Sequence, residues 1–221
     1  MDWRVKVASP VLGYNGILGP LGVTGGVIFP YTPQIQVTYA AQYDATPLTH
    51  SNYKVHMYSA SSVENIQVTG DFTAQDGGEA AYLLAVIHFF KSVTKMYYGL
   101  DGNRGTPPPL CYLTGLGEYQ FNNSPMAITS FNLNLPSDVD YIAASAGSAE
   151  AADHGALGGG LGAGGAASSP SFASSSGGTT MVPTKMQIAF SAIPIVSRMK
   201  VSNEFSLQSY STGALLGSGF W

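Results

Sequence analysis

The sequence predicts a mainly β protein in which six or so strands form a small closed or nearly closed barrel and one long helix packs over an opening. Three observations predict it. Several segments alternate apolar and polar residues with the period of a half-buried strand. Clusters of glycine, proline and asparagine separate these segments, as turns do. A single long stretch, Ala80–Tyr98, has neither glycine nor proline and carries apolar residues at helical spacing.

The segment from Val63 to Gly99 is predicted to form a strand, a turn and the helix. Asp76 followed by Glu79 has the spacing at which two unpaired backbone donors are satisfied reciprocally, so we expect the helix over residues 77–98. A helix that is apolar around most of its circumference is covered on more than one side. We therefore expect the following side chains to pack the helix or to seal a boundary between subunits: Tyr82, Leu83, Val86, Ile87, Phe89, Phe90, Val93 and Tyr97.

Residues 35–141 and 182–200 carry the strand patterns and are predicted to form a single β domain. Between them, residues 142–181 are almost entirely alanine, glycine and serine. Such a segment buries too little apolar area to offset its chain entropy. It therefore predicts a solvent-exposed insertion between two neighbouring strands.

Both ends of the chain are predicted to be extensions of this domain. Residues 1–34 are rich in glycine and, from Val7 on, carry no charge, which predicts an extended N-terminal arm that lies against another surface. Residues 201–221 mix aromatic and aliphatic side chains with small polar ones. This tail is too apolar to stay in water, so we expect it to dock on the domain or on a partner.

Charged residues make up 10% of the chain, against roughly 25% in an ordinary soluble domain. A surface with so few charges is poorly protected against association, and the 13 tyrosines and 10 phenylalanines favour interfaces. We infer a subunit whose surface is mostly interface; the alternative is a compact protein with a serine-, threonine- and asparagine-rich surface. The net charge of −4 argues against a basic nucleic-acid binder.

No pattern in the sequence predicts an enzyme, a cofactor or a metal site. The four histidines are scattered, and the single cysteine, Cys111, cannot form a disulfide within the chain. Asp138 and Asp140 lie on one side of an extended segment without a third ligand nearby in the sequence. The uncharged stretch from Val7 to Tyr43 contains too much glycine and proline for a membrane span, so we expect no membrane partner.

Four stretches resemble the tube-like baseplate proteins of contractile-tailed bacteriophages, which initiate the tail tube: Phe29–Pro33, Val68–Ala74 with the helix that follows, Phe131–Tyr141 and Val182–Met186. The resemblance implies a split β-barrel with a flanking helix, and a hexameric ring at the junction of baseplate and tail tube that templates tube assembly. It also implies contacts with tail tube, baseplate hub and tape measure proteins, a place in the virion, and assembly in the host cytoplasm.

Within such a ring, hairpin strands from every copy would form one large barrel around a channel. The polar faces of two strands are candidates for its lining: Asn65, Gln67, Thr69, Asp71, Thr129, Ser130, Asn132 and Asn134. A lining poor in lysine and arginine lets DNA pass without specific binding, because each neutralised phosphate strengthens binding through counterion release. Candidates for axial contacts to neighbouring rings are Phe29, Tyr31, Phe205, Tyr210 and Trp221.

A second interpretation is a β-barrel carbohydrate- or receptor-binding module of a virion. It predicts an exposed aromatic platform near a loop, and no ring. The sequence leaves open whether a ring-forming subunit belongs to the tube itself, to its initiator or to its terminator.

Overall fold

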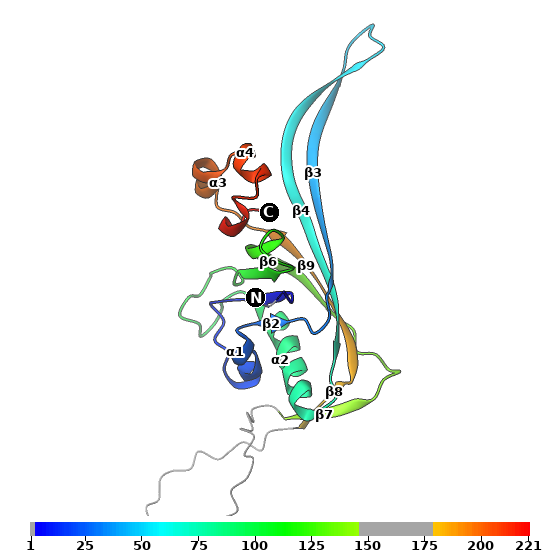
Figure 1. The fold of residues 1–221 in the computed structure, drawn as a ribbon, viewed down its shortest axis with the longest axis vertical. Coiled ribbons are helices and arrows are strands. Elements are labelled where there is room, and N and C mark those ends of the chain that lie inside the picture. The colour runs from blue at the N-terminus through cyan, green and yellow to red at the C-terminus, as the bar shows by residue number, and fades with distance from the viewer. Residues whose placement is uncertain (1–2, 146–178) are drawn as a thin grey trace, which may run out of the picture.

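The computed structural model describes residues 3–145 and 179–221 (Figure 1). Nine strands are assigned in these residues: β1 Lys6–Ala8, β2 Val27–Ile28, β3 Gln34–Pro47, β4 Lys54–Thr73, β5 Cys111–Gly115, β6 Phe121–Leu133, β7 Tyr141–Ser145, β8 Thr179–Pro183 and β9 Lys185–Pro194. The helices are α1 Gly19–Thr24, α2 Gly77–Val93, α3 Arg198–Glu204 and α4 Leu207–Ser211, with 3-10 turns η1 Gly16–Leu18 and η2 Leu216–Ser218.

Seven strands form one antiparallel sheet in the order β2-β1-β5-β6-β9-β4-β3, and β7 pairs with β8 in a separate sheet of two. The mainly β class with one dominant helix is confirmed. Of the closed or nearly closed barrel that the sequence predicts, the closed form is wrong for the single chain: among the described residues, the strands at the two ends of the large sheet, β2 and β3, do not pair with each other. A sheet with two ends keeps unpaired backbone groups on both.

Helix α2 begins where the sequence predicts and packs against one face of the sheet. The Asp76 carboxylate accepts a hydrogen bond from the Glu79 backbone N–H (2.8 Å), and the Glu79 carboxylate accepts one from the Gln75 N–H (2.7 Å). The helix ends at Val93, not at residue 98. The chain turns away there because Tyr97 exchanges backbone hydrogen bonds with Thr106 (3.3 Å) and Gly105 (2.9 Å).

The core lies between α2 and the sheet. Ile66, Val68 and Phe72 of β4 face the helix and are buried, while Gln67, Thr69 and Asp71 point to the other face. Phe90 of α2 is fully buried and stacks on Phe190 of β9, with ring centroids 4.9 Å apart. This alternation divides the sheet into an apolar face under α2 and a polar face that Figure 1 shows free of helices.

The N-terminal segment folds onto the domain and is not an extended arm. Strand β1 pairs with β2 and with β5, so it extends the sheet. Leu21 of α1 is fully buried in the core, and α1 and η1 both contact α2. Gly26 permits the close approach of β1 and β2, since a Cβ there would lie 2.7 Å from the Val7 carbonyl oxygen.

The C-terminal tail docks on the domain, which is one of the two surfaces expected for it. The Trp221 indole N–H donates to the Pro125 carbonyl (2.8 Å), and its ring lies 5.8 Å from that of Phe121. The insertion at 142–181 begins and ends in β7 and β8, which pair with each other. Its residues 146–178 lie outside the described residues.

Strands β3 and β4 run on beyond the rest of the molecule as a two-stranded hairpin (Figure 1). We call residues 41–62 the arm; every one of them is exposed. Within the arm, the rings of Tyr43 and Tyr58 contact each other across the two strands, with centroids 5.8 Å apart. An isolated two-stranded hairpin is marginal in water, so a contact that covered the arm would stabilise it.

Candidate functional site

The polar face of the sheet extends over four neighbouring strands, β3, β4, β9 and β6. Two rows of cross-strand neighbours define its centre: Gln36, Gln67, Ser191 and Ser130 in one, and Gln34, Thr69, Ala189 and Asn132 in the other. None of these eight side chains ionises. We call this surface the polar face. It offers amides and hydroxyls to whatever lies against it, and no formal charge at its centre.

The structure brings the predicted lining residues of β4 and β6 onto this surface. Asn65, Gln67, Ser130, Asn132 and Asn134 are exposed, and Thr69 and Asp71 are half-buried. Exposed Thr129 sits at a register shift in β6, where its hydroxyl donates to the Ser191 carbonyl (3.1 Å). Sequence reasoning missed the contributions of β3 and β9, although their alternation (Gln34 and Gln36; Gln187 and Ser191) carried the same signal.

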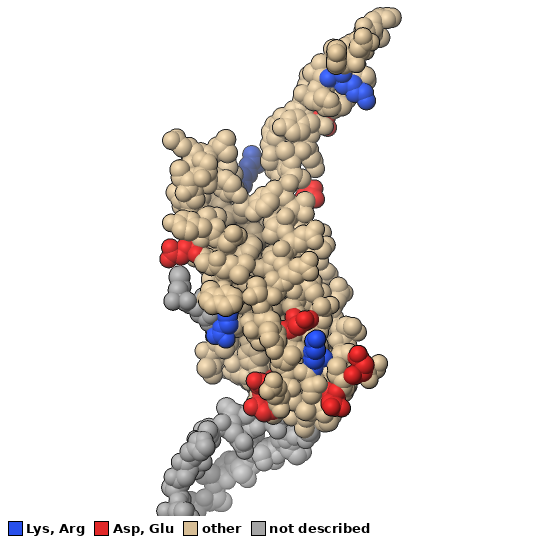
Figure 2. All heavy atoms as spheres, turned by 45° about the vertical axis from the view of Figure 1, so that its right-hand side comes forward, with Lys and Arg blue, Asp and Glu red and all other residues tan. Residues whose placement is uncertain are grey.

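Charged groups lie at the end of the polar face where β4 ends and β9 begins. Asp71 accepts a hydrogen bond from the Gln187 side-chain amide (3.2 Å), and Lys185 lies opposite Thr73 on the next strand. Figure 2 shows one side of the molecule, on which charged side chains gather toward the lower end of the body and leave broad uncharged areas above them. The weak field over these uncharged areas neither attracts nor repels a polyanion strongly.

Two unpaired strand edges border the four strands of the polar face. On one side β3 is the last strand of the sheet. On the other side β5 pairs with β6 only from Phe121 to Met126, so within the described chain residues 127–133 of β6 have a partner, β9, on one side only. Both edges expose backbone donors and acceptors that are templates for a further strand.

Apolar side chains next to both edges are incompletely covered. Ile35 and Val37 on β3, and Phe131 and Leu133 on β6, pack against the core but are only half-buried. All four lie on the α2 side of the sheet. The two edges are therefore alike in character, with partly open apolar side chains on one face and polar ones on the other.

A groove of about 440 Å³ lies on the α2 side, between β3, the β5–β6 turn and the C-terminal tail. We call it the aromatic groove; its lining includes Ile35, Val37, Tyr39, Tyr119, Phe121 and Trp221. No aspartate, glutamate, lysine or arginine lines it. Burial raises the pKa of Tyr39 above its usual value, and the nearby Tyr210 raises it further. The Tyr39 hydroxyl therefore stays neutral and can donate a hydrogen bond.

The helix residues singled out in the sequence occupy the interior of this chain. Leu83, Val86, Ile87, Phe89, Phe90 and Val93 are buried in its own core. Tyr82 is half-buried, and its hydroxyl accepts from the Ile28 N–H (2.8 Å) and donates to the Ile28 carbonyl (3.1 Å). Burial raises the pKa of Tyr82. Half-buried Tyr97 pairs with Thr106, as described above.

The axial-contact candidates are divided between core and surface. Phe29 is buried and packs on Phe72, with ring centroids 5.1 Å apart, so it has no free surface for a partner. Tyr31 and Phe205 are exposed. Tyr210 is half-buried, and its hydroxyl donates to the Trp221 backbone oxygen (2.8 Å), while Trp221 itself is 9% exposed.

Across residues 3–145 and 179–221, no three histidine, cysteine, aspartate or glutamate side chains come together as a metal ion would require. In the same residues, no helix is long and apolar enough to cross a membrane. No protein-family model matches the chain, and no curated protein matches it.

Proposed function

We propose that this chain is a structural virion protein that forms a ring with copies of itself, as do the tube-like baseplate proteins of contractile-tailed bacteriophages that its sequence resembles. The observation that carries the proposal is the polar face bounded by two unpaired edges of matching character. A strand edge left open in one copy is removed when another copy pairs with it. If the pairing repeats by rotation, the chain of copies closes into a ring.

The direction of the strands supports edge-to-edge pairing. Successive strands in the order β6-β9-β4-β3 are antiparallel, so β6 and β3 run in opposite directions. When β3 of one copy lies beside β6 of the next, the junction is antiparallel like the others. Four strands from each of six copies would make one continuous barrel, larger than the barrels of 16–18 strands that enclose an aqueous channel.

The side chains at the two edges support the same junction. Ile35 and Val37 of one copy would meet Phe131 and Leu133 of the next, and this contact would cover the half-buried apolar groups on both sides. On the opposite side of the sheet, the polar faces would join into one lining. Within each copy, α2 would then be the flanking helix of a split barrel whose remaining strands are β2, β1 and β5.

The lining of amides and hydroxyls suits a channel through which DNA moves. With no cation at the centre of the polar face, few phosphates are neutralised and the duplex is not held. We place the ring at the junction of baseplate and tail tube, where it would template tube assembly against tube, hub and tape measure proteins. The exposed arm is available for contacts of this kind.

The proposal is tested by measuring the mass of the purified protein by light scattering over a range of concentrations, with negative-stain images of each fraction. Closed rings with a central hole, in growing amount as concentration rises, are the expected result. A discrete monomer or trimer that binds a neutral oligosaccharide would instead support the carbohydrate- or receptor-binding module.

A further inference from the structure

The aromatic groove borders the edge at which we propose that copies meet. Three of its lining residues, Ile35, Val37 and Tyr39, lie on β3. Tyr39 and Tyr119 are 60% and 76% exposed, so the groove presents large aromatic surfaces to its occupant. Because it has no charged lining residue, it favours a neutral, apolar partner of limited size.

One segment of the chain has this character and lies at the opposite edge. Thr106–Leu110, which we call the proline segment, contains three consecutive prolines and no charge. It leads directly into β5, whose first residue, Cys111, pairs with Met126 of β6. The proline segment therefore lies where the free edge of β6 begins, at Ala127.

The strand directions bring the proline segment of one copy to the groove of another. An alignment with Ile35 of one copy opposite Leu133 of the next keeps the apolar side chains on one face, and it places Ala41 opposite Ala127 because the two strands run in opposite directions. Beyond Ala127 the neighbour's edge is taken by β5, whose first residue directly follows the proline segment. The proline segment would then lie close to Tyr39, which precedes Ala41 on β3, at the open side of the groove.

We propose that the proline segment of one copy docks in the aromatic groove of the next copy in the ring. This inference rests on the proposed ring. Consecutive prolines favour the polyproline II conformation, and grooves lined by aromatic side chains are a recurring way to bind it. The rigid segment loses little conformational entropy on docking.

The proline segment is held in place before any contact forms. At its start, the Thr106 carbonyl accepts a hydrogen bond from the Tyr97 N–H (3.3 Å). At its end, the Leu110 carbonyl accepts one from the hydroxyl of buried Ser9 (3.0 Å). Between these anchors Pro107 is exposed and Pro108 is half-buried, so two prolines present surface to a partner.

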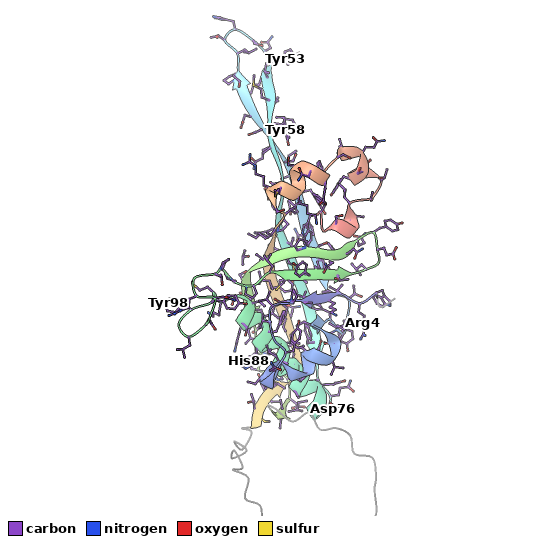
Figure 3. The ribbon with its side chains drawn as sticks, turned by 90° about the vertical axis from the view of Figure 1, so that its left-hand side faces the viewer. Arg4, Tyr53, Tyr58, Asp76, His88 and Tyr98 are labelled. Carbon is purple, nitrogen blue, oxygen red and sulfur yellow. The ribbon has the colours of Figure 1, made fainter. Side chains whose placement is uncertain are left out.

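Groove and segment lie on different sides of the molecule. Figure 3 shows the loop that carries Tyr98, and that returns to β5 through the proline segment, on the opposite side of the body from the C-terminal helices next to the groove. Two complementary patches on opposite sides make a head-to-tail contact. Such a contact closes into a ring when the rotation between copies allows it.

Cross-linking between differently tagged copies tests the docking. Copies with Tyr119→Cys are mixed with copies with Pro107→Cys and treated with a short bismaleimide; a second mixture joins Gln36→Cys to Asn132→Cys and reports on the strand edges alone. The control mixture pairs Tyr119→Cys with Val23→Cys, since Val23 is 93% exposed on α1 and belongs to neither patch. Products that join the two tags are expected in the first two mixtures and not in the control.

The outcomes separate the docking from the ring. Cross-links at the edges without cross-links at the groove would overturn the docking and leave the ring. Cross-links in neither mixture would overturn both. An equal yield in the control mixture would mean random collision and would also overturn the docking.

A double-mutant cycle gives an independent measurement. Tyr119→Ala and Pro107→Ala should each raise the concentration at which half of the protein is assembled by about tenfold, the effect of losing one good interface contact. The double variant should be no worse than either single variant, because both changes remove one contact. Additive effects, or a groove that binds a neutral oligosaccharide equally well in assembled rings, would contradict the docking.

Discussion

Phe90 of α2 stacks on Phe190 of β9, with ring centroids 4.9 Å apart and the two planes inclined by 30°. Phe131 of β6 lies on the same ring of Phe90, at 5.2 Å. This contact fixes α2 over the strands that carry the polar face on their other side. The helix thus supports the sheet from within one copy, and in the proposed ring the strand edges and the groove would make the contacts between copies.

A charge at the centre of this stack should unfold the chain. Phe90→Asp removes a fully buried ring and places a carboxylate in the core, and we expect a loss of at least about 4 kcal/mol in the free energy of unfolding. Urea denaturation followed by circular dichroism measures it. Lys91→Asp, on the exposed side of the same helix, is the control and should stay folded. A folded Phe90→Asp monomer that only fails to form rings would place the helix at the boundary between copies.

Charges at the two free edges should prevent ring formation without unfolding the copy. Val37→Lys and Leu133→Lys each put an ammonium group at a half-buried position that the junction would cover. The expected product is a folded monomer by light scattering, whereas Val23→Lys on α1 should still form rings. Rings of normal size from both edge variants would contradict pairing through β3 and β6.

Lysines on the polar face should retard DNA. Gln67→Lys and Asn132→Lys would each add one phosphate contact per copy, and the retention should weaken as salt is raised. Genome release from virions that carry these variants is the measurement, with Val23→Lys as the control for added charge. Release at the unmodified rate would mean that the polar face does not line the channel.

The Cys111 thiol should be inert in the folded protein. Burial raises the pKa of Cys111 to about 12, so at pH 8 only about one thiol in ten thousand is ionised, and the thiolate is the reactive form. Labelling with a maleimide should be slow until a denaturant unfolds the chain, and then proceed at the rate of an ordinary thiol. Rapid labelling in native buffer would show that the core opens at β5.

The cap of α2 should contribute measurably to stability. Asp76→Ala removes the acceptor for the Glu79 N–H and should cost about 1 kcal/mol in the free energy of unfolding. Asp76→Asn keeps an oxygen acceptor at the same place and should recover most of that loss. Equal losses in the two variants would indicate that charge, and not the hydrogen bond, is responsible.

The sequence was sufficient where the signal is local. The start of α2 follows from Asp76 and Glu79, and the polar face of β4 follows from strict alternation between Ile66 and Phe72. The end of α2 could not be predicted, because it depends on the backbone pairing of Tyr97 with Thr106 across the loop between them. The pattern of residues along the helix does not indicate that contact. The open sheet was missed for the same reason: strand alternation indicates which side of a strand is buried and carries no record of which strand lies beside it.

Two other segments show how tertiary contacts override local signals. Helix α1 contains Gly19, Pro20 and Gly22, which favour a loop, yet it forms because Leu21 is buried beneath it. The length of the arm could not be predicted, since residues that are exposed on both faces carry no signal of alternating burial. The aromatic groove had no sequence signature, because its lining comes from β3, the β5–β6 turn and the C-terminal tail.

The most direct test is a cryo-electron microscopy map of the assembled protein at a resolution that separates strands. The account predicts a closed ring whose inner wall is one continuous sheet, with Gln67 and Asn132 facing the hole and β3 of each copy beside β6 of the next. A soluble single copy at every concentration, or a ring whose inner wall is built from other residues, would contradict it.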